Sequence, residues 1–209
     1  MLAAVFLALW GEMGHAAAKI KLVALGDSIT AGLGVKLEEA YPARLQGLLT
    51  AKGLDVEIAN AGVSGDTAAD GLDRLEWSVP DGTDGVILAL GANDMLRGLD
   101  PGQTSATLEK TISALDARHI QILLVGMQAG TNYGDAYRSA FNKTFPDLAA
   151  KHGIGLYPFL LQDVALNPAL NQGDGIHPNQ KGAARIADLM LPSVLKLIER
   201  IAAIAPHPR

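Results

Sequence analysis

The stretch I-K-L-V-A-L-G-D-S-I-T-A-G, residues 20–32, joins an apolar run to a polar turn that contains glycine. The run is apolar except for Lys21 and is continuous from Leu22 to Leu25, which predicts a buried strand. A serine that follows such a strand, here Ser28, can cap a helix, bind a phosphate group or act as a nucleophile. The rest of the chain must distinguish these roles.

Four further strand patterns follow the first, and segments with helical spacing separate them. In residues 54–58 apolar and polar residues alternate, as in a half-buried strand. The predicted strands are residues 20–25, 54–58, 86–90, 120–125 and 154–159. The predicted helices lie within residues 41–49, 72–75, 108–115 and 137–148, and from Asn179 past Leu189. Pro146 and Pro192 are expected to break or kink the last two helices. This alternation predicts an α/β fold, with a mostly parallel sheet covered by helices on both faces.

Composition limits the class of protein. The 209 residues suffice for one domain, and 49% hydrophobic with 19% charged residues is typical of a folded chain. The formal net charge of -5 and the lack of a basic run argue against a nucleic-acid partner. The chain has no cysteine, which excludes disulfides, thiolate catalysis and cysteine-based zinc sites. Nothing in the sequence indicates an oligomeric state.

The N-terminus has the features of a signal peptide. The apolar run Leu2–Trp10 is too short to span a bilayer, and Ala16-Ala17-Ala18 resembles a cleavage site. No Lys or Arg precedes the run, which is atypical. We therefore expect residues 1–18 to be a signal peptide, residues 19–209 to form a single domain, and the protein to be periplasmic or secreted. The C-terminal stretch 189–204 carries charged residues, so we expect a core-packed helix and no integral membrane span.

Polar segments that contain glycine follow the first three predicted strands. They are G-D-S-I-T (26–30), N-A-G-V-S-G-D-T (60–67) and G-A-N-D (91–94), and a fourth, G-D-G-I-H-P (173–178), precedes the last helix. The carboxyl ends of parallel strands meet at one edge of a sheet, where α/β proteins bind their ligands. Four such segments at one edge favour a functional site over simple packing.

The residue types in these segments suit acyl transfer. A serine hydroxyl needs a base to accept its proton, and a histidine held by a carboxylate is the usual base. Asp174 and His177 are three residues apart, so one short turn can present both to Ser28. An oxyanion needs preorganised donors, and the candidates are the backbone amides at Ser28 and Gly65 and the side chain of Asn93.

Each of these residues, taken alone, has a plain structural alternative. Ser28 or Asp27 can cap a helix, and Asp174 can form an Asx turn before Pro178. The first segment lacks the spacing of a dinucleotide fingerprint and the lysine of a P-loop. Asp174 and His177 alone are two ligands short of a typical zinc site, so we expect no metal and no cofactor.

Together the four segments resemble the sequence blocks of the SGNH hydrolases, also called GDSL esterases. The resemblance spans nearly the whole mature chain and is strongest to the branch of multifunctional acyl-CoA thioesterase I, lysophospholipase and arylesterase enzymes. It implies a flavodoxin-like three-layer α/β/α sandwich with a five-stranded sheet, and hydrolysis of esters or thioesters without a metal. It also implies a nucleophile at Ser28, a base at His177, its partner at Asp174, and an oxyanion hole from Ser28, Gly65 and Asn93. Ile29 stands where the family name has leucine.

The substrate is a small-molecule ester or thioester by this interpretation. We expect short- to medium-chain acyl or aryl esters, with thioesters and lysophospholipids as further substrates. A mobile loop with Met95, Leu96 and Leu99 is expected over the acyl chain, and the other wall is expected from Met127, Tyr133 and Phe159. A carbohydrate O-deacetylase and a non-catalytic binding module are the alternatives. The presence of only two tryptophans disfavours stacking on sugars.

Overall fold

A five-stranded parallel sheet forms the centre of the protein. The computed structural model describes residues 19–204, so the expected signal peptide, residues 1–18, lies outside the described residues. The strands are β1 (Ile20–Gly26), β2 (Val56–Gly62), β3 (Gly85–Ala89), β4 (Gln121–Val125) and β5 (Gly155–Tyr157). Every pairing is parallel, and the order is β2-β1-β3-β4-β5.

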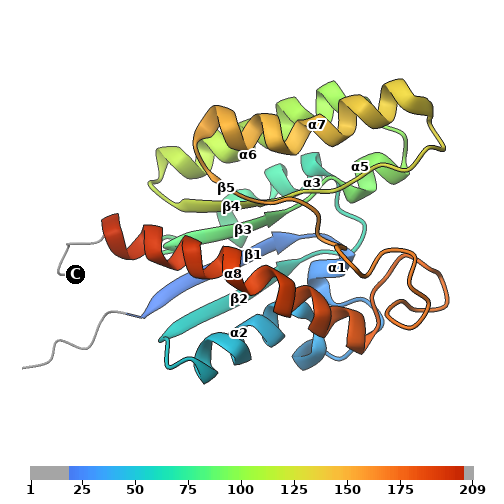
Figure 1. The fold of residues 1–209 in the computed structure, drawn as a ribbon. Coiled ribbons are helices and arrows are strands. Elements are labelled where there is room, and N and C mark those ends of the chain that lie inside the picture. The colour runs from blue at the N-terminus through green and yellow to red at the C-terminus, as the bar shows by residue number, and fades with distance from the viewer. Residues whose placement is uncertain (1–18, 205–209) are drawn as a thin grey trace, which may run out of the picture.

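Helices cover both faces of this sheet. They are α1 (Ser28–Ala31), α2 (Tyr41–Ala51), α3 (Ala68–Asp73), α4 (Leu75–Ser78), α5 (Ala92–Leu96), α6 (Pro101–Ala117), α7 (Gly134–His152) and α8 (Gln180–Ile204), with one 3-10 turn, η1 (Leu37–Glu39). Helices α2 and α8 lie on one face, and α3, α6 and α7 lie on the other (Figure 1). The expected flavodoxin-like three-layer sandwich is therefore confirmed.

The central strands are buried on both faces, as their continuous apolar sequences predict. All five residues of β3 are buried, and so are the last five of β1. Helices pack onto the two faces through large side chains such as Leu45 and Leu49 of α2, Phe141 and Phe145 of α7, and Met190 of α8. This packing fixes the direction of each strand and so fixes where each strand ends.

The second strand extends further than its sequence predicts. We expected residues 54–58, with Asn60 in the loop that follows, but β2 continues to Gly62. Asn and Gly are unfavourable in strands, and here they are held by backbone pairing of Gly62 opposite Gly26 of β1. The side chain of Asn60 also accepts a hydrogen bond from the Gly62 amide and donates one to the Thr30 carbonyl.

Neither proline breaks its helix, although a break or a kink was expected. Helix α7 continues through Pro146, and α8 continues through Pro192. Both prolines lie on exposed sides of their helices, while apolar residues on each side of them face the core. Tertiary burial therefore outweighs the local cost of a proline inside a helix, which is about 3 kcal/mol.

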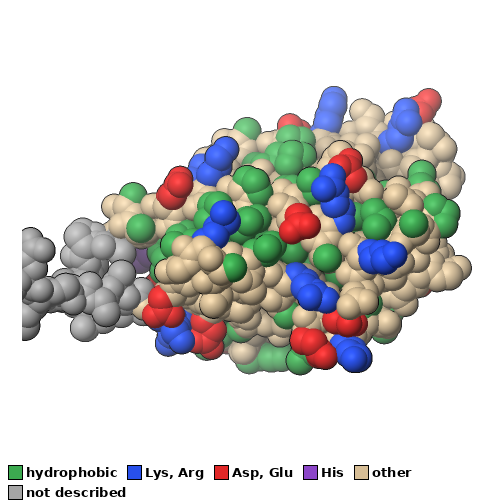
Figure 2. Space-filling view, turned by 60° about the horizontal axis from the view of Figure 1, so that its bottom comes forward, with side chains coloured by type: hydrophobic (Ala, Val, Ile, Leu, Met, Phe, Trp, Pro, Cys, Tyr) green, Lys and Arg blue, Asp and Glu red, His purple; other side chains and the backbone are tan. Residues whose placement is uncertain are grey.

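The surface carries charges of both signs. Figure 2 shows a face on which Lys and Arg side chains alternate with Asp and Glu among hydrophobic and uncharged residues. The long helix α8 is amphipathic, with a buried stripe that includes Ile186, Met190, Val194 and Leu197. In the described part of the chain, no helix combines the length and the apolar content needed to cross a bilayer.

Candidate active site

Asp27, and not Ser28, caps the helix that follows β1. The Oδ1 atom of Asp27 accepts a hydrogen bond of 3.0 Å from the Ile29 amide, which is N-cap geometry for α1. Ser28 is the first residue of α1 and is 8% exposed. Its hydroxyl is therefore not needed as a cap, and it lies at the carboxyl end of the sheet together with the other three polar segments (Figure 1).

The hydroxyl of Ser28 meets the side chain of His177. Ser28 Oγ lies 2.9 Å from His177 Nε2, and His177 Nδ1 lies 2.6 Å from Asp174 Oδ2. Residues from the first and the last of the four polar segments thus form one continuous hydrogen-bonded chain. This is the arrangement in which a histidine can take the proton of a serine hydroxyl while a carboxylate orients the ring.

The charge of Asp174 determines which imidazole nitrogen carries the proton. Hydrogen bonds from the His177 amide, the His177 ring and the Ile176 amide lower the pKa of Asp174 to about 2. The carboxylate is therefore ionised at neutral pH and can only accept, so Nδ1 of a neutral His177 donates to it. Nε2 is then an acceptor that points at the Ser28 hydroxyl. The bond from the Ile176 amide also forms an Asx turn. Asp174 therefore has both roles considered in the sequence, as a turn residue and as the partner of His177.

The second and third segments lie against each other. The backbone of Gly65 has a φ of +92°, an angle that residues other than glycine rarely adopt. The amide of Asn93 donates a hydrogen bond of 2.9 Å from Nδ2 to the carbonyl of Asp66, the residue after Gly65. An amide group has two N–H bonds, so Asn93 retains a second donor for a substrate oxygen.

Asn93 lies in a short helix, α5, that the sequence did not predict. The helix is held by Asp94, whose Oδ2 accepts from the Ala68 amide at 2.8 Å and whose Oδ1 accepts from Thr104 Oγ1 at 3.1 Å. These two bonds connect α5 to the start of α3 and to α6. Asp27 thus anchors the segment of Ser28, and Asp94 anchors that of Asn93.

Asp27 is the buried carboxylate of the site. It is 1% exposed, and its Oδ2 atom makes no hydrogen bond with any residue of 19–204. Burial raises its pKa to about 6, although the Ile29 amide and the nearby His177 act in the opposite direction. The residue that caps α1 directly before Ser28 is therefore a carboxyl group that loses its contact with water when the protein folds.

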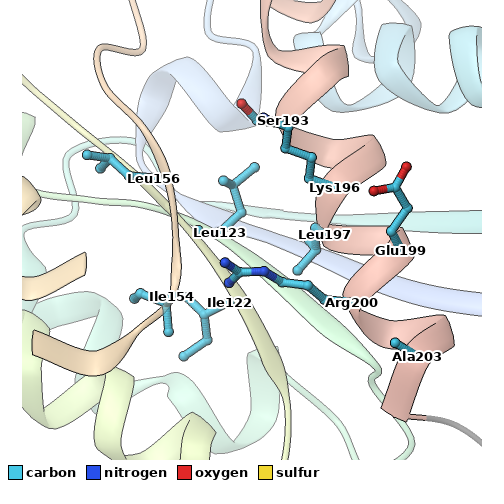
Figure 3. Close-up of a pocket in the computed structure, with 11 residues that line it drawn as sticks. Ile122, Leu123, Ile154, Leu156, Ser193, Lys196, Leu197, Glu199, Arg200 and Ala203 are labelled. Atoms are coloured by element: carbon cyan, nitrogen blue, oxygen red, sulfur yellow. The ribbon is translucent and has the colours of Figure 1, made fainter. Parts of the chain in front are cut away.

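Two of the hollows in the described part of the chain differ in kind. Beside Ser28 and His177 lies a small one of about 10 Å³, lined by residues that include Ile29, Tyr41 and Pro178. That volume holds at most about one water molecule, so an acyl chain cannot enter on this side without movement. A larger hollow of about 610 Å³ lies between α8 and the strands β4 and β5 (Figure 3).

The larger hollow is remote from Ser28. Its walls include Ile122 and Leu123 of the sheet and Lys196, Leu197 and Arg200 of α8 (Figure 3). Helix α8 begins next to the His177 segment, and at 1.5 Å per residue its later half lies roughly 20 Å or more from that start. Volume alone therefore does not locate the chemistry of this protein; the converging polar groups do.

The structure brings several of the expected substrate residues together. Tyr133 donates a hydrogen bond from its hydroxyl to the carbonyl of Leu96, and Tyr137 donates one to the carbonyl of Leu99. We call these two bonds the tyrosine clasp. The clasp holds residues 95–99, which were expected to form a mobile loop, against the start of α7. Leu96 and Leu99 still expose their side chains to solvent.

Met127 does not belong to an exposed wall. It is 3% exposed and packs in the hydrophobic core, two residues after the end of β4. Met95 is partly buried against the same core, and Phe159 is partly buried. Of the six residues expected in the substrate site, Leu96, Leu99 and Tyr133 are the ones that form an exposed cluster.

Two residues that hold the site together were missed in the sequence. Gln172 donates from Nε2 to the carbonyls of Leu33 at 2.7 Å and Pro178 at 3.0 Å, which joins the His177 segment to the end of the nucleophile turn. Arg74 is buried between α3 and α4. A single glutamine or arginine carries no sequence signal, and each of these two bonds a backbone carbonyl far away along the chain, that of Leu33 for Gln172 and that of Gly26 for Arg74. Within residues 19–204, no group of three or more His, Asp or Glu side chains is arranged to hold a metal ion.

The comparisons with known proteins agree with this geometry. Residues 24–185 match the GDSL-like Lipase/Acylhydrolase family. The chain is 37% identical over 193 residues to "Thioesterase 1/protease 1/lysophospholipase L1" of Escherichia coli (strain K12), covering 88% of each chain. It is 34% identical over 177 residues to "Arylesterase" of Vibrio mimicus, covering 84% of this chain and 88% of the relative.

A solved structure titled "Crystal Structure of TesA" superposes with a TM-score of 0.80 at 35% identity, covering 85% of this chain and 99% of that one. The chain therefore belongs to the GDSL-like lipase/acylhydrolase family and is an ester-hydrolysing enzyme of the SGNH class.

Proposed function

We propose that this protein hydrolyses carboxylic esters through an acyl-enzyme on Ser28. The observation that carries the proposal is the hydrogen-bonded chain from Ser28 Oγ to His177 Nε2 and from His177 Nδ1 to Asp174, at 2.9 and 2.6 Å. Asp174 is ionised and His177 is left with an acceptor facing the serine. This is the protonation state in which the reaction must begin.

In the first half of the reaction, Ser28 Oγ attacks the carbonyl carbon of the ester while its proton moves to His177 Nε2. The carbonyl π electrons move to the oxygen, which becomes an oxyanion. The amides of Ser28 and Gly65 and the side chain of Asn93 are the donors proposed to bind it. The C–O or C–S bond then breaks as the oxyanion collapses, and His177 gives its proton to the leaving alcohol or thiol.

In the second half, a water molecule attacks the acyl-enzyme. His177 accepts one proton from the water as its oxygen bonds to the acyl carbon. Collapse of this second oxyanion breaks the bond to Ser28 Oγ, and His177 returns the proton to the serine. The carboxylic acid leaves, and the enzyme is restored. These steps consume one water for each ester and need no cofactor.

The substrates proposed are short- to medium-chain acyl or aryl esters, with acyl thioesters and lysophospholipids as further substrates. The names of the relatives in the comparisons support this range. Leu96 and Leu99, with Tyr133, provide an exposed apolar surface next to the Asn93 helix. A carbohydrate deacetylase is not favoured, since those relatives are named for thioesters, lysophospholipids and aryl esters, and Trp77 lies outside the four polar segments.

The test compares wild type with Ser28→Ala on p-nitrophenyl esters of increasing acyl length, at equal folded concentration. We expect a maximum at one chain length for wild type and a loss of about 10⁴-fold or more in kcat for the variant. Activity that survives in Ser28→Ala would overturn the mechanism. A preference for acetyl esters of sugars over all other substrates would move the assignment to the deacetylase.

We also propose that residues 1–18 direct export and are removed, which would place the enzyme in the periplasm or outside the cell. The support is the apolar run Leu2–Trp10 and the cleavage-like Ala16-Ala17-Ala18. Expression of the full chain, fractionation and N-terminal sequencing test this. A mature protein that begins near Lys19 in the exported fraction is expected, and an uncleaved chain in the cytoplasm contradicts the proposal.

A further inference from the structure

Arg74 is a charged residue that lies almost wholly inside the protein. It stands between α3 and α4 and is 6% exposed. Arginine is almost never buried without partners, because taking its charge out of water is costly unless each N–H finds an acceptor. The partners of this side chain therefore indicate what its burial achieves.

The guanidinium group of Arg74 bonds two of the four polar segments at once. Its Nη2 donates to the carbonyl of Gly26 at 2.9 Å, and its Nε donates to Asp66 Oδ2 at 2.6 Å. Gly26 ends β1 two residues before Ser28, and Asp66 directly follows Gly65. A third bond, from Nη1 to Ser78 Oγ at 2.9 Å, anchors the group to α4.

The network continues from Asp66 to the third segment. The carbonyl of Asp66 accepts the hydrogen bond from Asn93, and the carbonyl of Gly65 accepts one of 2.7 Å from Arg97 on the exposed side. The backbone amide of Asp66 donates to the carbonyl of Val63. Hydrogen bonds through Arg74 and Asp66 therefore connect the segments that carry Ser28, Gly65 and Asn93.

We propose that Arg74 is a positioning residue that holds the Gly65 amide and the Asn93 side chain at a fixed place relative to Ser28. The proposal rests on the proposed function, in which these groups are nucleophile and oxyanion donors. Donors act on a transition state only when they are aimed before the reaction, and a misplacement of about 1 Å can cost about 10²-fold in rate. Arg74 touches no reacting atom.

Lysine cannot reproduce this role, which provides a sharp test. Its single ammonium group can keep the charge next to Asp66, but it lacks the planar fork that reaches Asp66, Gly26 and Ser78 together. Arg74→Lys therefore retains the ion pair and removes the geometric constraint. If the buried charge served stability alone, the lysine variant would fold less stably and catalyse normally once folded.

The first experiment measures kcat and KM of Arg74→Lys on a p-nitrophenyl ester, with concentrations corrected for the folded fraction. We expect kcat to fall about 10- to 100-fold, with KM within about twofold, because the lost interaction acts on the transition state. Arg118→Lys is the matched control. Arg118 also binds a carbonyl, that of Val79, and an acid, Asp81, but it contacts none of the four segments. Its kcat is expected within about twofold of wild type.

The second experiment is a double-mutant cycle with Asn93→Ala. If Arg74 acts by aiming Asn93 and Gly65, part of its effect is already lost in Asn93→Ala. The double variant is then expected to lose clearly less activity than the product of the two single losses. Losses that multiply fully, an unchanged kcat in Arg74→Lys, or an equal loss in Arg118→Lys would each overturn the proposal.

A variant in which both Arg74 and Asp66 are replaced by neutral residues keeps the proposal testable if Arg74→Lys fails to fold. In Arg74→Met combined with Asp66→Asn, neither partner leaves a buried charge behind, and the fork is still absent. The same fall in kcat is expected from this variant, and failure of both it and Arg74→Lys to fold would assign Arg74 to stability and overturn the proposal. Ser28→Ala is measured alongside: activity in that variant would contradict the proposed function, whereas an inactive Ser28→Ala with a fully active Arg74→Lys would contradict only the role of Arg74.

Discussion

The two halves of the candidate active site are built in different ways. The nucleophile half is internal, with Ser28 as the first residue of α1 and the buried Asp27 directly before it. The histidine half is a surface segment outside any helix or strand, and the side chain of Asp174 is 45% exposed. Helices and sheet fix the position of Ser28, whereas local hydrogen bonds and one glutamine fix that of His177.

This difference indicates where each half is vulnerable. Changes in the nucleophile half are expected to affect stability and its dependence on pH, because buried groups are involved. Changes in the histidine half are expected to affect the rate and to leave the fold intact, because their surroundings are largely solvent. The following experiments test that division.

The largest effect is expected from Asp174→Asn. The amide oxygen can still accept from the Ile176 and His177 backbone, so the turn and the melting temperature should hardly change. The ring of His177 loses the negative charge that orients it, and a fall in kcat of about 10⁴-fold is expected. Steady-state kinetics and thermal unfolding check both parts. Asp163→Asn, another exposed acid, is the control and should stay within about twofold of wild-type activity. A loss below about tenfold in Asp174→Asn would contradict the comparison.

Asp27→Asn is expected to act on stability in the buried half. The folded-state pKa of Asp27 is raised to about 6 from 3.8, so the native protein binds its proton more tightly than the unfolded chain does. The contribution of Asp27 to the free energy of unfolding therefore falls as pH rises from about 4 to about 6, and this contribution is constant above that range. The slope accounts for about 3 kcal/mol over two pH units. Asparagine keeps the N-cap acceptor and removes the titration.

Urea unfolding of wild type and Asp27→Asn at pH 4, 5, 6 and 7 measures this slope directly. The free energy of unfolding of the variant should gain on that of wild type as pH rises. Asp163 provides a control of opposite sign. Its pKa is lowered by the hydrogen bond from Arg185, so its ionisation adds to stability as pH rises, and Asp163→Asn cannot remove a fall in the free energy of unfolding. Parallel pH profiles for wild type and Asp27→Asn would show that Asp27 is not desolvated as described.

Gln172→Ala is expected to have a moderate effect on the exposed half. The change removes the bonds from Nε2 to the carbonyls of Leu33 and Pro178, which hold the histidine segment against the nucleophile turn. One neutral hydrogen bond contributes about 0.5–1.5 kcal/mol, so kcat should fall about three- to tenfold with a small change in melting temperature. Gln162→Ala, which removes a hydrogen bond to the exposed Asp163, should leave kcat unchanged. Equal kinetics in the two variants would remove Gln172 from the site.

The smallest effect is expected at the rim. Leu96→Ala with Leu99→Ala removes exposed apolar surface and keeps the backbone carbonyls of the tyrosine clasp. Each methylene of an acyl chain that loses contact forfeits at most about 0.8 kcal/mol, so the ratio of kcat/KM between octanoyl and butyryl esters should fall about two- to fivefold. Trp77→Ala, which removes a still more exposed side chain from α4, is the control. An unchanged ratio in the leucine variant would place the acyl chain elsewhere.

Much of the fold follows from short-range pattern. The buried strands β1, β3 and β4 are continuous apolar runs, and the helices between them have apolar residues at helical spacing. The helix breaks considered at the prolines of α7 and α8 do not occur, and the end of β2 was predicted wrongly, because packing and pairing with distant segments override local preference there. Helices α1 and α5 are too short to show a period at all.

The amino-acid sequence by itself determined the class of fold and the residue types that meet at its functional edge. An alternation of strands and helices leaves the ends of parallel strands on one side, and Ser28, Gly65, Asn93 and His177 all occur in the segments that lie there. Only the tertiary structure decided that Asp27 is the cap and Ser28 the partner of His177. It also decided that Gln172 joins the two halves and that Arg74 connects three of the segments. The physical reason is that the bonds of Asp27 and Gln172, and the bond from Arg74 to Gly26, involve backbone groups, which every residue carries. The bond between Ser28 and His177 joins side chains 149 positions apart, which only the folded chain brings together.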